Sequence, residues 1–336
     1  MPCTVIVGGF FGDEGKGKII AYLARQYRPT IAARGGVGPN AGHTFVLNGK
    51  TYKVRMLPSA ALNASTRLYI GPGVLVNPEI LLDEVRTFDA GDRVFVDPQC
   101  GVITKEHIEK DNTNYPKTRI GTTGTGTGPA NADRALRTLK MARDVPELLE
   151  YIDDVSSDIN YALDKKERVI IEGTQGTFLS LYYGEYPFVT SKDVTSSAIC
   201  SDVGVGPKRV DEVLLVFKSY VTRVGQGPLK YEIDDEEARR KGWTEYGSVT
   251  GRQRRAAPFD MDLARKSIQL NSATQLALTK LDVVFPTSAG LKEYSKLSAD
   301  ARKFIENIEQ ETGLKVTLIG TGAELTDIID RSSQDP

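Results

Sequence analysis

The sequence lacks the patterns that build disulfide frameworks, zinc sites or membrane spans. Three of its 336 residues are cysteine, and Cys3, Cys100 and Cys200 form no C-x-x-C pair. Scattered thiols of this kind indicate a reduced protein rather than a disulfide scaffold or a zinc site. No apolar run approaches the roughly 20 residues of a transmembrane helix. A predicted strand follows the first residues at once, so we expect a cytoplasmic protein without a signal peptide.

An excess of charge of either sign is also lacking. The chain has 43 basic and 44 acidic residues, which gives a formal net charge of −1. No global positive field therefore favours nucleic acid or an anionic membrane as a partner. Hydrophobic residues make up 40% of the chain, enough for a substantial core. Because no repeat, low-complexity linker or clean boundary divides it, residues 1–336 are predicted to form a single domain.

Glycine, in contrast, is abundant, and residues 5–20 (VIVGGFFGDEGKGKII) contain five of the 32 glycines. A β-branched run, a glycine loop with two lysines and an apolar-periodic segment predict a strand, a phosphate-cradling loop and a helix. The loop is not a Walker loop, because Phe10 and Gly17 replace the required Gly and Ser or Thr. Asp13 and Glu14 predict a catalytic carboxylate beside the phosphate and its metal. A glycine-rich turn with solvated acids is the alternative.

Predicted strands and helices alternate along the chain. The predicted strands cover residues 4–7, 30–34, 168–172, 213–220 and 275–278, with further apolar runs at 44–47, 67–70 and 93–96. The predicted helices cover residues 17–26, 78–88 and 131–143. This alternation predicts an α/β fold with a large, mainly parallel central sheet that is flanked by helices.

Only two histidines are present, and they lie in different surroundings. His43 belongs to the loop 40–44 (NAGHT). Beside a phosphate loop that carries an acid, its imidazole is a candidate proton donor to a transferring phosphoryl group. A structural role is the alternative. His107 lies in a stretch rich in lysine and glutamate, and we expect it at the surface.

Three further loops carry polar groups that suit ligands. Residues 119–127 alternate threonine and glycine, whose hydroxyl and N–H groups suit a phosphate; a flexible surface loop is the alternative. Gln175 follows a predicted strand and offers an amide donor and an acceptor to a base edge. Residues 248–255 include three arginines within four positions, which suit a carboxylate; a solvated basic loop is the alternative.

Taken in chain order, these motifs resemble those of the adenylosuccinate synthetase family. They are GDEGKGK (12–18), NAGHT (40–44), GTTG (121–124), EGTQG (172–176), YPFVTS (186–191), VTGR (249–252) and TKLD (279–282). They span nearly the whole chain, and the short length is similar to the archaeal form of the family. The resemblance implies a P-loop-like nucleotide-binding architecture with that family's fold, and a carbon–nitrogen ligase that uses Mg²⁺. It also implies a homodimer with shared active sites.

The resemblance further implies a role for individual residues. Asp13 corresponds to the catalytic base and His43 to the acid, while Mg²⁺ would contact Asp13 and the carbonyl of Gly42. The implied donor-nucleotide contacts are Gly12, Gly15, Lys16, Gly17, Gly42, His43, Thr44, Arg254, Lys280, Asp282, Gly320 and Gly322. The implied purine-nucleotide contacts are Asp13, Asn40, Thr122, Thr123, Arg137 from the neighbouring subunit, Gln175, Thr190, Val224 and Arg252. The implied L-aspartate contacts are Val249, Thr250, Gly251, Arg252 and Arg254.

The chain departs from the common family pattern at residues that the resemblance places near substrates. Phe10 and Phe11 replace Gln-Trp, Gln253 interrupts the arginine run, and Gly320 and Ala323 replace Ser and Pro. We therefore favour a branch found in phages, which couples L-aspartate to C6 of dGMP through a 6-phosphoryl intermediate. Its product is N6-succino-2-amino-2′-deoxyadenylate for 2-aminoadenine DNA, and its donor is ATP or dATP. The alternatives are an enzyme of AMP biosynthesis that uses IMP and GTP, and a nucleotide-binding regulator without turnover.

Overall fold

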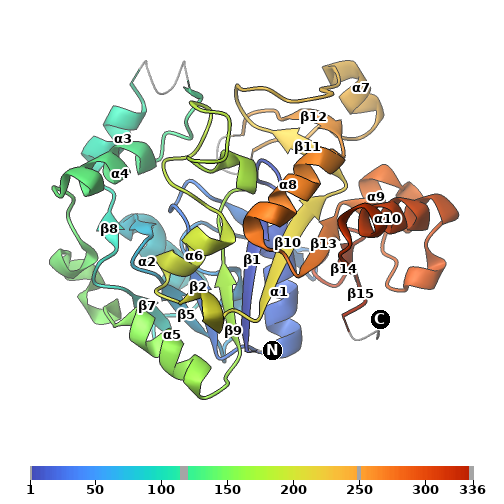
Figure 1. Cartoon of the computed structure of the whole chain (residues 1–336). Coiled ribbons are helices and arrows are strands. Elements are labelled where there is room, and N and C mark those ends of the chain that lie inside the picture. The colour runs from blue at the N-terminus through green and yellow to red at the C-terminus, as the bar shows by residue number, and fades with distance from the viewer. Residues whose placement is uncertain (1, 114–119, 248–250, 333–336) are drawn as a thin grey trace.

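The computed structural model describes residues 2–113, 120–247 and 251–332, and nine of its strands form one sheet (Figure 1). Their order is β15 (Ile328–Asp330), β14 (Val316–Gly320), β13 (Gln275–Thr279), β10 (Glu212–Lys218), β1 (Cys3–Gly8), β9 (Val169–Glu172), β2 (Ile31–Arg34), β5 (Arg67–Ile70) and β7 (Val94–Val96). All neighbours are parallel except β14 and β15, which are antiparallel. The mainly parallel sheet predicted from the alternation is therefore confirmed.

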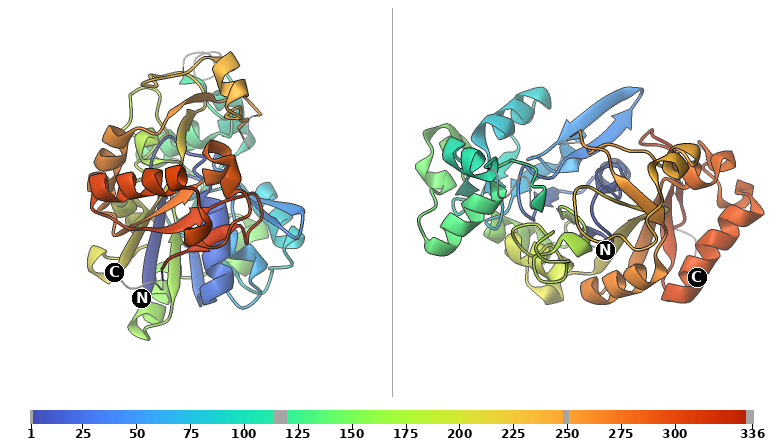
Figure 2. Two further views of the ribbon diagram at one scale, coloured as in Figure 1. Left: turned by 90° about the vertical axis from the view of Figure 1, so that its right-hand side faces the viewer. Right: turned by 90° about the horizontal axis from the view of Figure 1, so that it is seen from above.

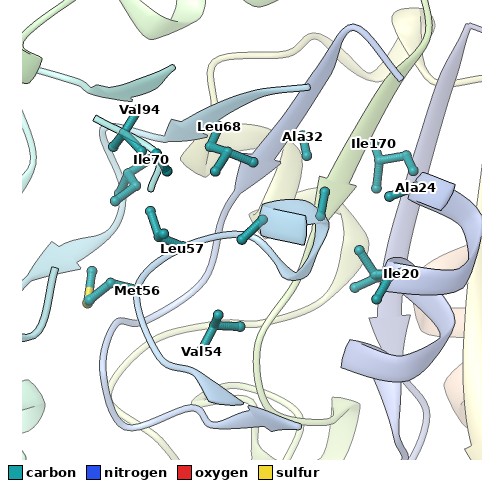
Figure 3. Packing of buried hydrophobic residues seen from close by; sticks show 14 of the residues in the cluster. Ile20, Ala24, Ala32, Val54, Met56, Leu57, Leu68, Ile70, Val94 and Ile170 are labelled. Atoms are coloured by element: carbon teal, nitrogen blue, oxygen red, sulfur yellow. The ribbon is translucent and has the colours of Figure 1, made fainter. Parts of the chain in front are cut away.

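Both faces of this sheet are buried, because alternate residues of each strand enter different hydrophobic clusters. In β1, Ile6 enters one cluster, whereas Val5 and Val7 enter the other. The first cluster also holds residues of α1 (Lys16–Tyr27) and α2 (Pro78–Thr87). Figure 3 shows Ile20 of α1 in this cluster, together with Ala32 and Ile170 of the sheet. The second cluster holds residues of α5 (Val155–Asp164), α6 (Ser196–Asp202), α8 (Met261–Asn271) and α10 (Ala299–Thr312).

The remaining elements surround the sheet. Among them are the helices α3 (Lys105–Asp111), α4 (Thr127–Leu136), α7 (Asp235–Arg240) and α9 (Leu281–Val284). Six further strands form a parallel pair, β6 (Leu75–Val76) with β8 (Gly101–Val102), a hairpin, β3 (His43–Leu47) with β4 (Lys50–Val54), and an antiparallel pair, β11 (Tyr220–Arg223) with β12 (Arg255–Pro258). Seen from above in Figure 2, the β3–β4 hairpin lies on the opposite side of the molecule from α8 and α10. None of the described helices has the length and apolar character that a bilayer crossing requires.

Three predicted elements differ from the structure. The apolar run 44–47 lies in the β3–β4 hairpin, outside the central sheet, because its partner is the adjacent strand. The predicted strand 213–220 is divided after Lys218, because the N–H of Ser219 donates to the carbonyl of Thr279 and β11 pairs with β12 instead. The predicted helix 131–143 begins earlier and ends at Leu136, because Arg137 adopts a left-handed conformation with φ of 63°.

The loops that carry the predicted motifs follow the carboxyl ends of sheet strands. Residues 9–15 follow β1, residues 35–42 follow β2, and residues 173–176 follow β9. Lys280 follows β13, and residues 321–323 follow β14. Since these strands are parallel, their carboxyl ends meet at one edge of the sheet, which is where α/β proteins bind ligands.

Candidate active site

A cavity of about 920 Å³ lies at this edge and is lined by most of the predicted site residues. Those that line it are Gly12, Asp13, Gly15, Lys16, Gly17, Asn40, Gly42, His43, Thr44, Thr122, Thr123, Gln175, Thr190, Val224, Arg252, Arg254, Lys280, Asp282, Gly320 and Gly322. Arg137 and Gly251 are exposed and do not line it. Val249 and Thr250 lie outside the described residues.

The glycine loop owes its form to contacts made within the loop and with His43. A Cβ placed on Gly17 would lie 2.7 Å from the Cβ of His43, so the Ser or Thr of a Walker loop does not fit there. The carboxylate of Glu14 accepts the N–H groups of Phe10, at 3.0 Å, and Gly12, at 2.8 Å. It also pairs with the Nζ of Lys16 at 3.0 Å. Glu14 is therefore buried as a structural brace, and of the two loop acids only Asp13 lines the cavity.

His43 is held by a buried carboxylate that the sequence interpretation did not single out. Its Nδ1 contacts Glu172 and lies 2.9 Å from the Nη1 of Arg34, which also contacts Glu172. The other Glu172 oxygen accepts the N–H of Ser59 at 2.6 Å. Arg34 and Glu172 are register partners at the ends of β2 and β9. A charged residue at the end of each of two predicted buried strands is the sequence feature that could have identified this pair. With Nδ1 facing Glu172, Nε2 is the ring nitrogen left for a ligand.

Burial and charge set the protonation states in this cluster. Burial, followed by the Arg34 guanidinium, lowers the pKa of His43 to about 4. Burial alone would raise the pKa of Glu172, but Arg34 and His43 outweigh it and lower that pKa to about 2. The free protein therefore holds a neutral imidazole against an ionised carboxylate at neutral pH.

Asp13 is held by a second cluster. It adopts a left-handed conformation with φ of 63°, and its carboxylate pairs with the Nη2 of Arg254 at 2.7 Å. The Nη1 of Arg254 pairs with Glu245 at 2.9 Å. Burial raises the pKa of Asp13, and the guanidinium of Arg254 opposes that rise. Glu245 is a further residue that the sequence interpretation missed; it lines the cavity but precedes the arginine run by several positions.

The predicted purine-nucleotide contacts meet through side chains from distant segments. The Nδ2 of Asn40 donates to the hydroxyl of Thr190 at 3.3 Å. Asn40 Oδ1 is buried without a hydrogen-bond partner among the described residues, so it is available to a ligand donor. The hydroxyl of Thr122 donates to Asp111 at 2.8 Å, and the N–H of Gly126 donates to the same carboxylate at 2.8 Å. Asp111, also missed, thus braces the threonine-glycine loop.

Arg252 brings the arginine loop to the threonine-glycine loop. Its Nη2 donates to the carbonyls of Gly121 at 2.7 Å and Thr122 at 3.3 Å. The predicted aspartate and phosphate subsites therefore share one wall of the cavity. The part of this loop that contains Val249 and Thr250 is not described, so their contacts with aspartate stay predictions.

The predicted donor-base subsite is built on the ends of β13 and β14. Lys280 is left-handed with φ of 60° and caps the short helix α9, of which Asp282 is the second residue. Asp282 Oδ1 is buried and accepts no hydrogen bond from the described residues. Lys18 donates to the carbonyls of Gly322 at 2.7 Å and Asp327 at 2.8 Å, which fixes the loop after β14. A buried carboxylate oxygen without a donor suits the N–H edge of a purine base.

Two of the departures that suggested altered substrates lie away from the cavity. Phe10 is buried beneath the loop, with its ring centroid 4.7 Å from that of Phe217. Gln253 is exposed and donates to Asp235 at 3.0 Å. Phe11 does line the cavity, with the Arg223 guanidinium 4.5 Å from its ring centroid. The expectation that Phe10 and Gln253 lie near ligands is therefore wrong.

The expectation of a surface His107 is also wrong. His107 is buried and completes a capping box at the start of α3, where its Nδ1 accepts the N–H of Thr104 at 3.0 Å. Its Nε2 faces Asp133 at 3.0 Å. The polar sequence around it reflects the exposed side of α3, whereas the tertiary contact with α4 covers the imidazole.

The residues predicted for Mg²⁺ suit an ion that is completed by substrate phosphates. Asp13 and Gly42 line the same cavity, beside the glycine loop. Within the described ranges, no group of three or more histidine, cysteine or acidic side chains could enclose a metal. Mg²⁺ is usually held by one or two carboxylates together with phosphate oxygens and water, so this donor set fits it.

Comparisons with known proteins found a family model and relatives that cover most of the chain. A family model described as adenylosuccinate synthetase matches residues 5–145 and 138–288. The adenylosuccinate synthetase of Methanocaldococcus jannaschii is 54% identical, over 98% of this chain and 97% of its own. That of Methanococcus vannielii is 51% identical, over 98% of this chain and 99% of its own.

Two solved structures have similar folds. Fully ligated adenylosuccinate synthetase from Plasmodium falciparum has a TM-score of 0.90 at 26% identity, covering 97% of this chain and 99% of that one. Succinoaminodeoxyadenylate synthetase of cyanophage S-2L, bound to dGMP and dATP, has a TM-score of 0.81 at 26% identity. That match covers 98% of this chain and 95% of the cyanophage protein.

Proposed function

The chain belongs to the adenylosuccinate synthetase family and is a carbon–nitrogen ligase, and we propose that it joins L-aspartate to C6 of IMP with GTP as donor. Relatives at 51% and 54% identity over 98% of the chain bear the name adenylosuccinate synthetase, and this carries the proposal. The cyanophage protein with dGMP is 26% identical. We therefore propose IMP rather than dGMP as the purine substrate. Phe10 and Gln253, two of the departures on which the expectation of dGMP rested, do not line the cavity.

The donor is proposed to be GTP because of Asp282. Its buried Oδ1, which has no hydrogen-bond partner among the described residues, can accept a hydrogen bond from the N1–H of guanine. Adenine presents an acceptor at N1, so it would leave this oxygen unsatisfied. A buried polar group that is left without its partner discriminates strongly between analogues, by about 10⁴ in favourable cases.

The chemistry is proposed to proceed in two displacements. Asp13 removes the proton from N1 of IMP, charge develops on O6, and O6 attacks the γ-phosphorus while GDP departs. The amine of L-aspartate then attacks C6, and the 6-phosphoryl group leaves as phosphate. His43, oriented by Glu172, donates a hydrogen bond through Nε2 to the transferring phosphoryl group, whose negative charge favours the imidazolium. When bound by Asp13 and the Gly42 carbonyl, Mg²⁺ would neutralise phosphate charge.

The carboxylates of L-aspartate are assigned to Arg252 and Arg254. Both guanidinium groups line the cavity, and a guanidinium fork matches a carboxylate in two parallel hydrogen bonds. The backbone of Val224 is assigned to the sugar, and the threonine-glycine loop with Thr190 to the 5′-phosphate.

The homodimer with shared sites is proposed from the family resemblance, with Arg137 reaching the site of the partner subunit. Arg137 is exposed at the end of α4 and does not line the cavity of its own chain, so it is free to reach a neighbour. Mixing inactive Asp13→Ala and Arg137→Leu protomers is expected to restore activity, because one site of each mixed dimer has both residues. Proven subunit exchange without restored activity would remove Arg137 from the partner's site.

One substrate panel tests the proposed function. L-aspartate and Mg²⁺ are supplied with IMP, GMP or dGMP, each against GTP, ATP or dATP, and phosphate release is followed. We expect the highest kcat/KM with IMP and GTP, and an Asp282→Asn variant that loses more activity with GTP than with ATP. The highest kcat/KM with dGMP and dATP would restore the phage-type reaction.

A further inference from the structure

The carboxylate of Glu245 lies where the catalytic side of the cavity meets the donor-base side. One oxygen, Oε2, accepts from the Nζ of Lys218 at 2.9 Å and from the Nη1 of Arg254 at 2.9 Å. The other, Oε1, accepts from the hydroxyl of Tyr220 at 2.5 Å and lies 3.6 Å from the Nζ of Lys280. Each oxygen thus faces a different substrate subsite.

Two buried cations, Lys218 and Arg254, pair with the same oxygen of this carboxylate. The side chain of Lys218 is 2% exposed and that of Arg254 is 6% exposed, so neither cation is hydrated by bulk water. Glu245 is 16% exposed and stays ionised: burial would raise its pKa, but Lys218 and Lys280 outweigh burial and lower it to about 2. Without Glu245, two buried like charges would face each other, which is strongly unfavourable.

The guanidinium of Arg254 spans two carboxylates. Its Nη1 is fixed by Glu245 while its Nη2 pairs with Asp13, and the group is planar and rigid. Fixing Nη1 therefore sets the direction in which Nη2 points. If Glu245 were neutral, Arg254 would keep Asp13 as its charged partner, which would hold the base more firmly and turn the fork away from L-aspartate.

We propose that Glu245 is a positioning residue: it draws the Arg254 guanidinium partly away from Asp13 and orients it for L-aspartate. Through Lys280, the same carboxylate couples this orientation to the donor-base loop. The proposal rests on the proposed function, in which Arg254 binds L-aspartate. Tyr220 of β11 and Lys218 of β10 hold the Glu245 carboxylate in place. These two strands therefore set the orientation of the Arg254 guanidinium, although Arg254 itself lies in a loop.

A neighbouring pair provides a matched control. Arg255 Nη1 pairs with Glu232 at 2.8 Å, one residue along the chain from Arg254. Both side chains of this pair are about one-third exposed, and neither lines the cavity. Glu232→Gln therefore removes the same charge from the same kind of pair without touching the site.

The test compares the steady-state kinetics of Glu245→Gln and Glu232→Gln with those of the wild type. For Glu245→Gln we expect the KM for L-aspartate to rise at least about tenfold and kcat to fall, while both nucleotide KM values change less than about threefold. Glu232→Gln is expected to match the wild type. Wild-type constants for Glu245→Gln, or an equal rise in all three KM values, would overturn the proposal.

A double variant separates positioning from stability. Glu245→Gln combined with Lys218→Met removes both charges of the buried pair, a change that is often nearly neutral for folding. We expect its Tm to return towards the wild-type value while the KM for L-aspartate stays raised. Recovery of that KM together with Tm would show that Glu245 acts only in folding. If the wild type itself released no phosphate in response to L-aspartate, the proposed function would fail, whatever the variants did.

Discussion

The two side chains that we propose for catalysis, His43 and Asp13, are each held by a carboxylate and a guanidinium, but in different parts of the molecule. His43 is held by Glu172 and Arg34, which end two adjacent strands of the sheet and are almost fully buried. Asp13 is held by Arg254, and through it by Glu245, in loops that follow other strands; its side chain is 27% exposed. The carboxylate–guanidinium pair beside His43 is therefore rigid and buried, whereas the pair that includes Asp13 is accessible to ligands.

This difference suits the order of the proposed chemistry. The group facing the transferring phosphoryl must be preorganised, since electrostatic stabilisation is largest when donors need not move during the reaction. The base must instead exchange partners, because Asp13 is paired with Arg254 in the free protein and has to receive a proton from the substrate. A loop-borne arginine permits this exchange.

Turnover is expected to fall most when either of the side chains proposed for catalysis is removed. We expect Asp13→Ala and His43→Ala each to lower kcat by about 10²–10⁴, the usual range for a general base or acid. Calorimetric titration should show that both variants still bind nucleotide. Near-wild-type turnover in either variant would contradict the catalytic role of that residue, and the cluster that holds it would then not serve catalysis.

Changing the buried carboxylate on the acid side is expected to destabilise the fold most. Glu172→Gln leaves Arg34 as an unpaired buried cation, and breaking such a pair lowers the free energy of unfolding by about 3–5 kcal/mol. We expect a smaller loss for Glu245→Gln, because that side chain is partly exposed. Urea unfolding of both variants checks this; the reverse order would mean that the base side is the rigid one.

On the base side, Arg252→Leu is expected to raise the KM for L-aspartate more than that for either nucleotide. Loss of a charged partner from a desolvated carboxylate typically costs about 2–5 kcal/mol of binding free energy. A smaller rise in the nucleotide KM is also expected, because Arg252 donates to the carbonyls of Gly121 and Thr122. Initial-rate kinetics with each substrate varied in turn measure both. Arg255→Leu is the matched control, and equal effects on all substrates would move Arg252 out of the aspartate subsite.

The smallest expected effect is a pH dependence of stability on the acid side. The pKa of Glu172 is lowered from its ordinary value of 4.5 to about 2 in the folded state. The contribution of ionised Glu172 to the free energy of unfolding is therefore fully present above about pH 4.5 and is lost as the pH falls towards 2. The difference in unfolding free energy between the wild type and Glu172→Gln should shrink between pH 7 and pH 3. A difference that stayed constant would mean that Glu172 is not ionised in the fold.

The types of chemical group available at the site follow from local sequence motifs. The glycines, acids and lysines of residues 9–18, the NAGHT loop and the TKLD segment indicate backbone turns and hydrogen-bonding groups locally, and their loops meet around one cavity. The parallel sheet was also predictable, because strand and helix periodicities are local properties. The 131–143 helix was misjudged, because the left-handed Arg137 leaves no periodic signal.

The partner that holds each group, in contrast, depends on contacts between segments that are distant in the sequence. Arg34 and Glu172 are 138 residues apart and meet because β2 and β9 are neighbours in the sheet, an order that no local pattern encodes. The pairing of Glu245 with Lys218, the burial of His107 against Asp133, and the surface position of Gln253 likewise depend on packing between distant segments. Side-chain type sets what a residue can bind, whereas strand order and packing set what it meets.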